Sequence, residues 1–116
     1  MIPLRPFKIH QPADLAQASD MLKDLGDEAS TYAGGTELLL AMKFEVLHYP
    51  HLVDIKEIPQ LNNIEVTDTH LEIGGTTTHY QLERSKLIRS HLPVVAEMES
   101  RVANVRVRTT GTIGGN

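Results

Sequence analysis

The sequence contains neither cysteine nor tryptophan and has few other aromatic residues. Among its 116 residues are only two Phe and three Tyr. Without thiols, the chain can form no disulfide and can hold no iron–sulfur cluster through thiolates. So few aromatic rings argue against a base-stacking surface for nucleic acid, and the formal charge of −4 points the same way.

Several signature motifs are also missing. No apolar run approaches the length of a membrane-spanning helix, and residues 1–6 lack the apolar core of a secretory signal. We therefore expect no membrane span and a cytoplasmic location.

Neither Gly-x-Gly-x-x-Gly nor a P-loop occurs. His48 and His51 are three residues apart, but no third ligand is spaced to complete a zinc site, so we expect no metal.

Two glycine-rich stretches stand far apart in the chain. Residues 33–39 read Ala-Gly-Gly-Thr-Glu-Leu-Leu, and residues 111–116 read Gly-Thr-Ile-Gly-Gly-Asn. Paired glycines let the backbone turn tightly and present consecutive N–H groups to a bulky anion. Two such loops suit a ligand with a pyrophosphate in its middle. Because a ligand loop rarely forms the last residues of a chain, we expect this sequence to be a piece of a longer protein.

The first half of the chain has the pattern of a small parallel α/β lobe, which we place at residues 1–56. Asp14 is a candidate N-cap and Gly26 a candidate C-terminal stop for one helix, and Thr36 is a candidate cap for the next. The expected strands are 7–10, 31–33 and 52–55, and the expected helices are 15–25 and 36–43. Alternation of strands and helices favours parallel pairing.

The second half, residues 57–116, is expected to be a mixed or antiparallel α+β lobe of the same domain, truncated at its C-terminal end. Residues 64–66 and 71–73 alternate as the strands of a hairpin. Thr78 resembles the start of a capping box for a helix at about 80–87. Pro93 suits the first turn of a further helix, which carries Val102 as a core residue. The fold class is therefore α+β.

The two glycine loops resemble those of a known family. Residues 33–39 are similar to the first flavin-adenine-dinucleotide (FAD) loop in the medium subunit of molybdenum hydroxylases, such as aerobic carbon monoxide dehydrogenase and xanthine dehydrogenase, with Glu37 in place of an aspartate. Residues 111–116 match that family's second loop. In the run before it, Ala103, Asn104 and Arg108 are kept, whereas Val105, Arg106 and Thr109 depart. The resemblance covers almost the whole chain.

The resemblance implies the FAD-binding fold of the molybdopterin dehydrogenase (PCMH-like) type and noncovalently bound FAD. Free N–H groups and the helix dipole after Gly34-Gly35 would face the phosphates. It implies no catalytic residue of the chain's own. The expected cofactor-binding residues are Tyr32, Ala33, Gly34, Gly35, Thr36, Glu37, Leu38, Thr76, Val102, Gly111, Thr112, Ile113, Gly114, Gly115 and Asn116. The alternative is that both loops are simple turns, and that Val102 and Thr76 serve only the core and a strand edge.

The resemblance further implies an oxidoreductase subunit that relays electrons from iron–sulfur clusters through FAD to an acceptor such as NAD or a quinone. Its partners would be a molybdopterin-binding large subunit and an iron–sulfur small subunit, and the fragment alone would be inactive. Two alternatives remain. One is an enzyme like UDP-N-acetylenolpyruvylglucosamine reductase, and the other is a nonenzymatic docking module.

Overall fold

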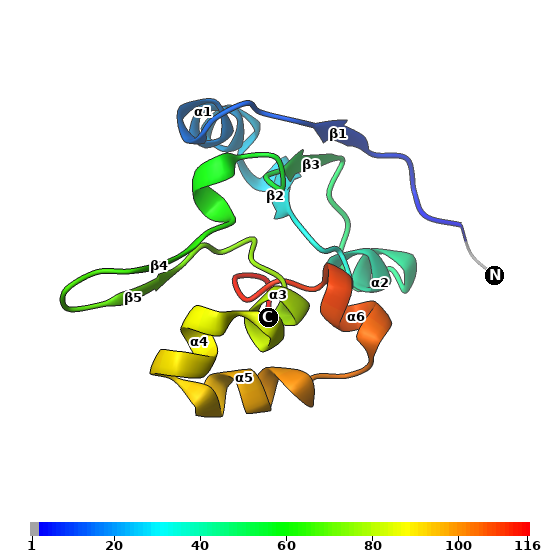
Figure 1. Ribbon diagram of the computed structural model, residues 1–116. Coiled ribbons are helices and arrows are strands. Elements are labelled where there is room, and N and C mark those ends of the chain that lie inside the picture. Colours follow the sequence, from blue (N-terminus) through cyan, green and yellow to red (C-terminus); the bar gives the residue numbers. More distant parts are fainter. Residues whose placement is uncertain (1–2) are drawn as a thin grey trace. The chain divides into compact units, whose positions relative to one another are not determined.

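The structure, a computed structural model, describes residues 3–116 and divides the chain into two compact units (Figure 1). These units are Met1–Ile58 and Pro59–Asn116. The sequence predicts a lobe boundary after residue 56, close to this division. Each unit is described separately below.

A parallel sheet forms the centre of the first unit. Its strands are β1 (Lys8–His10), β2 (Ala29–Tyr32) and β3 (His51–Asp54), in the order β1-β3-β2, and both pairings are parallel. The predicted parallel pairing is confirmed. β3 is central, and its residues Leu52 and Val53 are fully buried. The central strand is therefore the apolar one, as expected for a strand covered on both faces.

Helix α1 (Leu15–Leu25) begins and ends where the sequence predicts. The Asp14 side chain accepts a hydrogen bond from the Gln17 N–H, and the Gln17 side chain accepts one from the backbone N–H of residue 13. Gly26 follows the helix with a φ of 57°, a left-handed conformation that glycine adopts without strain. The 3₁₀ turn η1 (Gly26–Glu28) then leads into β2.

Helix α2 (Leu38–Lys43) ends at the predicted residue but begins later than predicted. Thr36 is not its N-cap. Glu37 precedes the first helical residue, and no side chain caps the helix. Gly34-Gly35 and the following turn take up more chain than a direct strand-to-helix junction, so the start of the helix moves two residues along.

The second unit combines an antiparallel hairpin with short helices. The hairpin consists of β4 (Ile64–Val66) and β5 (Leu71–Ile73), as predicted. The remaining elements are η2 (Pro59–Leu61), α3 (His79–Arg84), α4 (Lys86–His91), α5 (Pro93–Ser100) and α6 (Val105–Thr110). These helices and the hairpin are labelled in Figure 1. A core of Leu82, Ile88 and Ala96 lies between the helices, and apolar side chains of the hairpin pack against it.

Two predictions for the second unit were wrong in detail, and one helix was missed. The expected helix at 80–87 is two helices, because Ser85 adopts an extended conformation and its side chain caps α4 through the Ile88 N–H. α5 ends at Ser100, so Val102 lies outside it. α6 was not predicted. Asn104 caps it through the Val107 N–H, which is a local signal that its polar, β-branched composition obscured.

Within residues 3–116, no helix has both the length and the apolar character needed to cross a bilayer.

Candidate functional site

The first loop, residues 33–37, connects β2 to α2. Gly35 has a φ of 73°, and a Cβ at this position would lie 2.6 Å from Cε2 of the Tyr32 ring. Both facts require glycine, because other residues are strained at this φ and the ring occupies the space of a side chain. The ring of Tyr32 therefore packs beneath the turn.

The first loop presents a run of free backbone donors. The N–H groups of residues 34–38 have no acceptor among residues 3–116, and the first N–H used by the helix is that of Leu39, which donates to the Gly35 carbonyl at 3.1 Å. Unpaired N–H groups at a helix start carry partial positive charge and bind anions. The Glu37 side chain is exposed at this helix start. These N–H groups are therefore free to donate to a bound group.

Lys56 supports the first loop from the end of the neighbouring strand. Its Nζ donates to the Ala33 carbonyl at 3.1 Å, lies 3.0 Å from Asp54 Oδ1 and sits 3.9 Å from the centroid of the Tyr32 ring. Sequence reasoning missed Lys56. Its position just after β3 could have indicated it, since the carboxyl ends of the neighbouring parallel strands β2 and β3 lie at one edge of the sheet, where the first loop begins. A cation thus stands beside the glycine turn.

Asp54 fixes Lys56 in place. Burial by itself raises the pKa of this carboxyl, but hydrogen bonds from the Lys56 backbone N–H, the Lys56 ammonium and the Gln11 amide outweigh it and hold the pKa below its usual value. Asp54 is therefore a charged, hydrogen-bonded anchor.

The second loop, residues 111–116, uses its backbone donors differently. The Ile113 N–H donates to the Thr77 carbonyl at 2.9 Å, and the Gly114 N–H donates to the Gly75 carbonyl at 2.8 Å. This differs from the expected run of free N–H groups. Within residues 3–116, only the N–H groups of residues 112 and 116 in this loop lack an acceptor. The loop is bound to residues 74–77, a segment that begins with a further glycine pair, Gly74-Gly75.

Gly114 is required by contacts inside the protein. A Cβ at this position would lie 2.6 Å from the Gly75 oxygen and 3.0 Å from its Cα. These are backbone atoms, which cannot move aside as the end of a side chain can. The two glycine pairs therefore pack backbone against backbone. This contact alone explains why residue 114 is a glycine, without any ligand.

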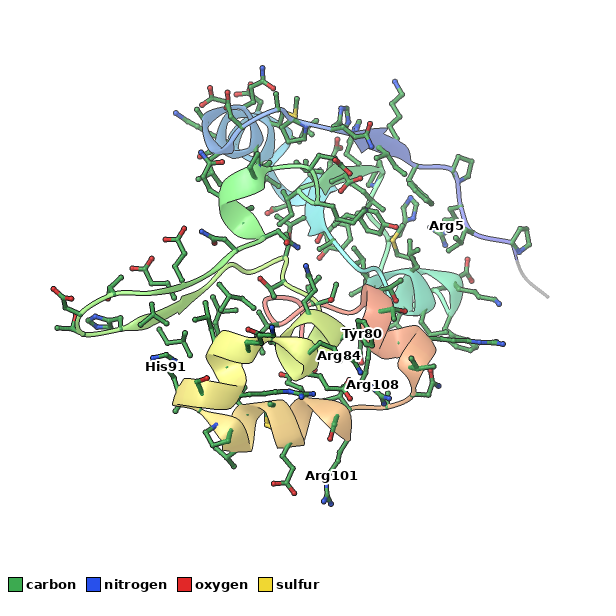
Figure 2. All side chains as sticks on the ribbon, in the orientation of Figure 1. Arg5, Tyr80, Arg84, His91, Arg101 and Arg108 are labelled. Atoms are coloured by element: carbon green, nitrogen blue, oxygen red, sulfur yellow. The ribbon has the colours of Figure 1, made fainter. Side chains whose placement is uncertain are left out.

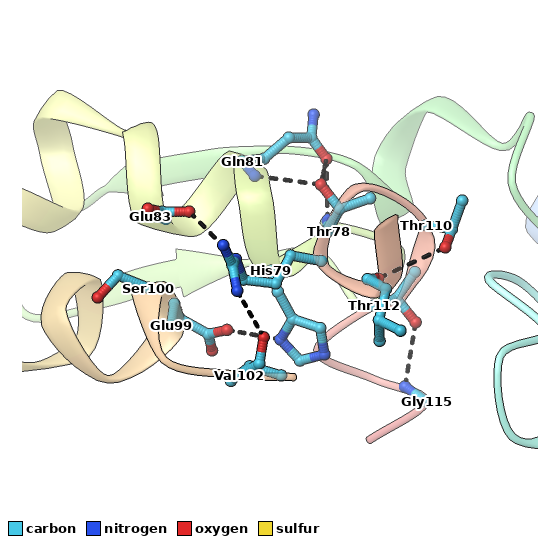
Figure 3. A network of polar contacts seen from close by, with 12 residues as sticks. Thr78, His79, Gln81, Glu83, Glu99, Ser100, Val102, Thr110, Thr112 and Gly115 are labelled. Atoms are coloured by element: carbon cyan, nitrogen blue, oxygen red, sulfur yellow. Dashed lines mark hydrogen bonds and ion pairs between the residues drawn. The ribbon is translucent and has the colours of Figure 1, made fainter. Parts of the chain in front are cut away.

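Thr112 is buried at the centre of the second loop. It forms an antiparallel bridge with Thr78, and its Oγ1 accepts a hydrogen bond from the Gly115 N–H at 3.2 Å (Figure 3). The Thr78 side chain caps α3 through the Gln81 N–H, as the sequence predicts. The loop is thus tied to the start of α3.

A buried histidine–glutamate pair lies behind the second loop. His79 Nδ1 is 2.5 Å from Glu99 Oε2, and both side chains are almost wholly buried (Figure 3). The His79 backbone N–H donates to the Gly111 carbonyl at 3.1 Å. Sequence reasoning missed this pair because the two residues are far apart in the chain and Glu99 lies in an apolar helix.

The two remaining candidates lie in the second unit. Thr76 is buried, and its hydroxyl donates to the Leu61 carbonyl at 2.7 Å. Val102 is half-buried, and its carbonyl accepts from Arg108 Nη1 at 2.9 Å. In both cases the polar group is used within the protein.

The basic run at residues 101–108 does not form one cationic patch. Arg101 projects from the end of α5 and pairs with Glu97 at 3.1 Å (Figure 2). Arg108 is largely covered and lies 3.6 Å from Glu83. Each of these cations already has a carboxylate partner.

Metal ligation finds no support in the described part of the chain. No group of three or more His, Cys, Asp or Glu side chains in residues 3–116 is arranged to hold a metal ion. His51 is paired with His10, whose Nε2 lies 3.0 Å from His51 Nδ1. The partner of His51 is therefore His10, and not His48, which is three residues away in the sequence.

The donors and the glycine turn of the first loop fit a phosphate group, and comparison with known proteins indicates which ligand carries it. The profile of the family described as "FAD binding domain in molybdopterin dehydrogenase" matches residues 5–116. The chain belongs to this family. The resemblance noted in the sequence and the α+β FAD-binding fold are thereby confirmed.

Individual relatives agree with this assignment. The carbon monoxide dehydrogenase medium chain of Hydrogenophaga pseudoflava is 38% identical over 116 residues, which are 100% of this chain and 40% of the relative. The xanthine dehydrogenase FAD-binding subunit of Escherichia coli O157:H7 is 35% identical over 108 residues, covering 92% of this chain and 37% of the relative.

A solved structure of carbon monoxide dehydrogenase from Hydrogenophaga pseudoflava superposes with a TM-score of 0.95 at 35% identity, covering 97% of this chain and 39% of that one. This chain thus spans about two fifths of the length of the relatives it matches.

Proposed function

We propose that this chain is the N-terminal, FAD-binding portion of the medium subunit of a molybdenum hydroxylase. The observation that carries the proposal is the run of free N–H groups at residues 34–38, located at a helix start in a chain of the FAD-binding family. Bound FAD supplies the redox chemistry, and the protein supplies binding, orientation and electrostatics.

In this proposal, the first loop is the main anion-binding element. Its free N–H groups donate to phosphate oxygens, and the Thr36 hydroxyl adds a further donor. Lys56, which is paired with Asp54, places its ammonium beside the Ala33 carbonyl. We include Tyr32 and Leu38 as the residues that support the turn and start the helix.

The second loop takes part through fewer groups. The N–H groups of residues 112 and 116 and the side chain of Asn116 are its available donors. Residues 111–116, Thr76 and Val102 stay in the proposed set of cofactor contacts. Because the hydroxyl of Thr76 is bonded to Leu61, its contact would be a packing contact.

For the holoenzyme, we infer a molybdopterin-binding large subunit and an iron–sulfur small subunit as partners, and NAD or a quinone as acceptor. Support comes from the relatives, which are named as a medium chain and an FAD-binding subunit. The cytoplasmic location expected from the sequence stays a prediction. The relatives named above are dehydrogenase subunits and not enolpyruvyl reductases. The docking-module alternative differs in binding no flavin.

The test uses the full-length gene product that contains this chain. We expect it to carry noncovalent FAD, seen in its absorbance spectrum and released on unfolding. After removal of FAD, ADP should compete with its rebinding, whereas riboflavin, which lacks phosphate, should compete poorly. A folded product that binds neither FAD nor ADP would contradict the proposal and favour the docking module.

A further inference from the structure

His79 is held from two directions at the base of the second loop. It is the first residue of α3, and its backbone N–H donates to the Gly111 carbonyl at 3.1 Å. Its side chain reaches the other way, to Glu99 on α5, with 2.5 Å between Nδ1 and Oε2. His79 therefore connects the core helix α5 to the residue that begins the glycine loop.

The imidazole ring also contacts the loop directly. A Cβ on Gly111 would lie 3.1 Å from Cδ2 and 3.5 Å from Nε2 of His79, and 3.0 Å from the Val107 carbonyl oxygen. The Gly111 N–H is bonded to that same carbonyl at 2.6 Å. Gly111 is thus enclosed between the ring and the last turn of α6, so the orientation of the ring determines where the loop begins.

The burial of Glu99 needs an explanation beyond stability. Its side chain is 1% exposed, and within residues 3–116 His79 is its hydrogen-bond partner. Burying a carboxylate is costly, and an apolar pair of similar volume is often as stable as a buried ion pair. What the pair does provide is a single ring orientation, because the contact between Nδ1 and the carboxylate holds the ring with its Cδ2–Nε2 edge beside Gly111.

We propose that His79 and Glu99 are positioning residues for FAD, which act by fixing the conformation of the second glycine loop. This inference rests on the proposed function, since it assigns FAD to that loop. Neither side chain touches the cofactor in this account. His79 holds Gly111 in a fixed position relative to α5. The free N–H groups of the loop, those of residues 112 and 116, are then held in one arrangement.

The experiment compares variants that keep the His79–Glu99 hydrogen bond with variants that remove it, in the full-length protein. His79→Asn and Glu99→Gln keep a donor and an acceptor in place, whereas the double variant His79→Leu/Glu99→Leu replaces the pair with apolar groups. Three quantities are measured: thermal unfolding without FAD, the Kd for FAD, and amide exchange at residues 111–116 without FAD.

We expect the double leucine variant to unfold near the wild-type temperature, because an apolar pair can replace a buried ion pair, and to bind FAD roughly tenfold more weakly, because the loop is no longer held in one conformation. Its loop amides should exchange faster. The Asn and Gln variants should retain most of the affinity and the slow loop exchange, because they keep the hydrogen bond. A folded double variant with wild-type Kd and loop exchange would overturn the inference.

Two further outcomes stay decisive. If the double variant does not fold, Gly111→Ala leaves both side chains in place but crowds the ring and the Val107 carbonyl. We expect faster amide exchange at residues 112–116 without FAD and a Kd for FAD that rises by roughly tenfold; unchanged loop exchange and Kd overturn the inference. If the wild-type protein itself binds no FAD, the proposed function fails. The loop exchange of the double variant then still shows whether the pair fixes the loop.

Discussion

At the scale of single residues, the glycines that resemble one another in the sequence have different physical roles. A Cβ on Gly114 would lie 2.6 Å from the Gly75 oxygen, whereas a Cβ on Gly75 meets nothing nearer than the Gly114 Cα at 4.0 Å. We therefore expect Gly114→Ala to lower the free energy of unfolding by about 1–3 kcal/mol, the usual cost of an overpacked site.

Gly75→Ala is the matched control and should change the free energy of unfolding by less than about 0.5 kcal/mol. Denaturant titration of both variants provides the measurement. Equal losses of stability in the two variants would show that the backbone contact between them does not restrict Gly114.

Asp54 gives the first unit a defined dependence on pH. Its pKa is lowered in the folded protein from the usual value of 3.8, so its contribution to stability is fully present above that value and is lost as the pH falls through the lower, folded pKa. Asp54→Asn should therefore cost about 1–2 kcal/mol at pH 7. Urea titrations at decreasing pH should show the difference between the two proteins shrinking below about pH 4. If the difference in unfolding free energy stayed constant with pH, the charge of Asp54 would not contribute to stability.

Lys56 should matter for the cofactor because its ammonium stands at the first loop. Lys56→Met keeps much of the aliphatic stem and removes the charge, and we expect it to weaken FAD binding about three- to tenfold, less so at high salt. Lys23→Met, an exposed lysine in the last turn of α1, is the control. FAD titrations normalised to the folded fraction compare the two, and equal affinities would remove Lys56 from the site.

At the scale of secondary-structure elements, the sequence predicts what is local and apolar. The capping signal at Asp14, the stop at Gly26 and the alternation in the hairpin each act within a few residues, and all three predictions are confirmed. The break at Ser85 was missed because a serine within a helical pattern is also compatible with a continuous helix.

The site was predictable in outline for a similar reason. The glycine motifs locate both loops, because a tight backbone turn leaves a mark in a few adjacent residues. The contacts that support the loops leave no such local pattern. Lys56 reaches Ala33 and His79 reaches Glu99 across 23 and 20 residues of sequence, so tertiary packing alone brings these pairs together.

Helix α6 shows how a short element can be tested. The Asn104 side chain accepts from the Val107 N–H at 3.1 Å, and this cap fixes the helix that leads into the second loop. Asn104→Ala should cost about 1 kcal/mol and speed amide exchange in α6. Asn104→Ser, which restores a capping oxygen, should recover most of both effects. If alanine and serine behave alike, capping does not hold this helix.

At the scale of the whole molecule, each of the two units carries one glycine loop, and the proposed function assigns a role in FAD binding to each loop. A ligand that binds only the folded protein stabilises the segments it contacts and slows their opening. In the full-length protein, addition of FAD should therefore slow amide exchange at residues 34–38 and also at residues 112 and 116. The exposed turn of the hairpin, residues 67–70, should exchange at the same rate with and without FAD, and serves as the internal control.

The pattern of protection distinguishes the assignments. Protection in both loops supports both assignments. Protection confined to residues 34–38 would leave the first loop as the anion site and reduce the second to a structural turn, as its internally bonded N–H groups at residues 113–115 permit. Repeating the measurement with ADP separates the parts of the cofactor, because a loop that binds the pyrophosphate should be protected by ADP as well as by FAD. A loop protected by FAD alone would contact the flavin portion instead.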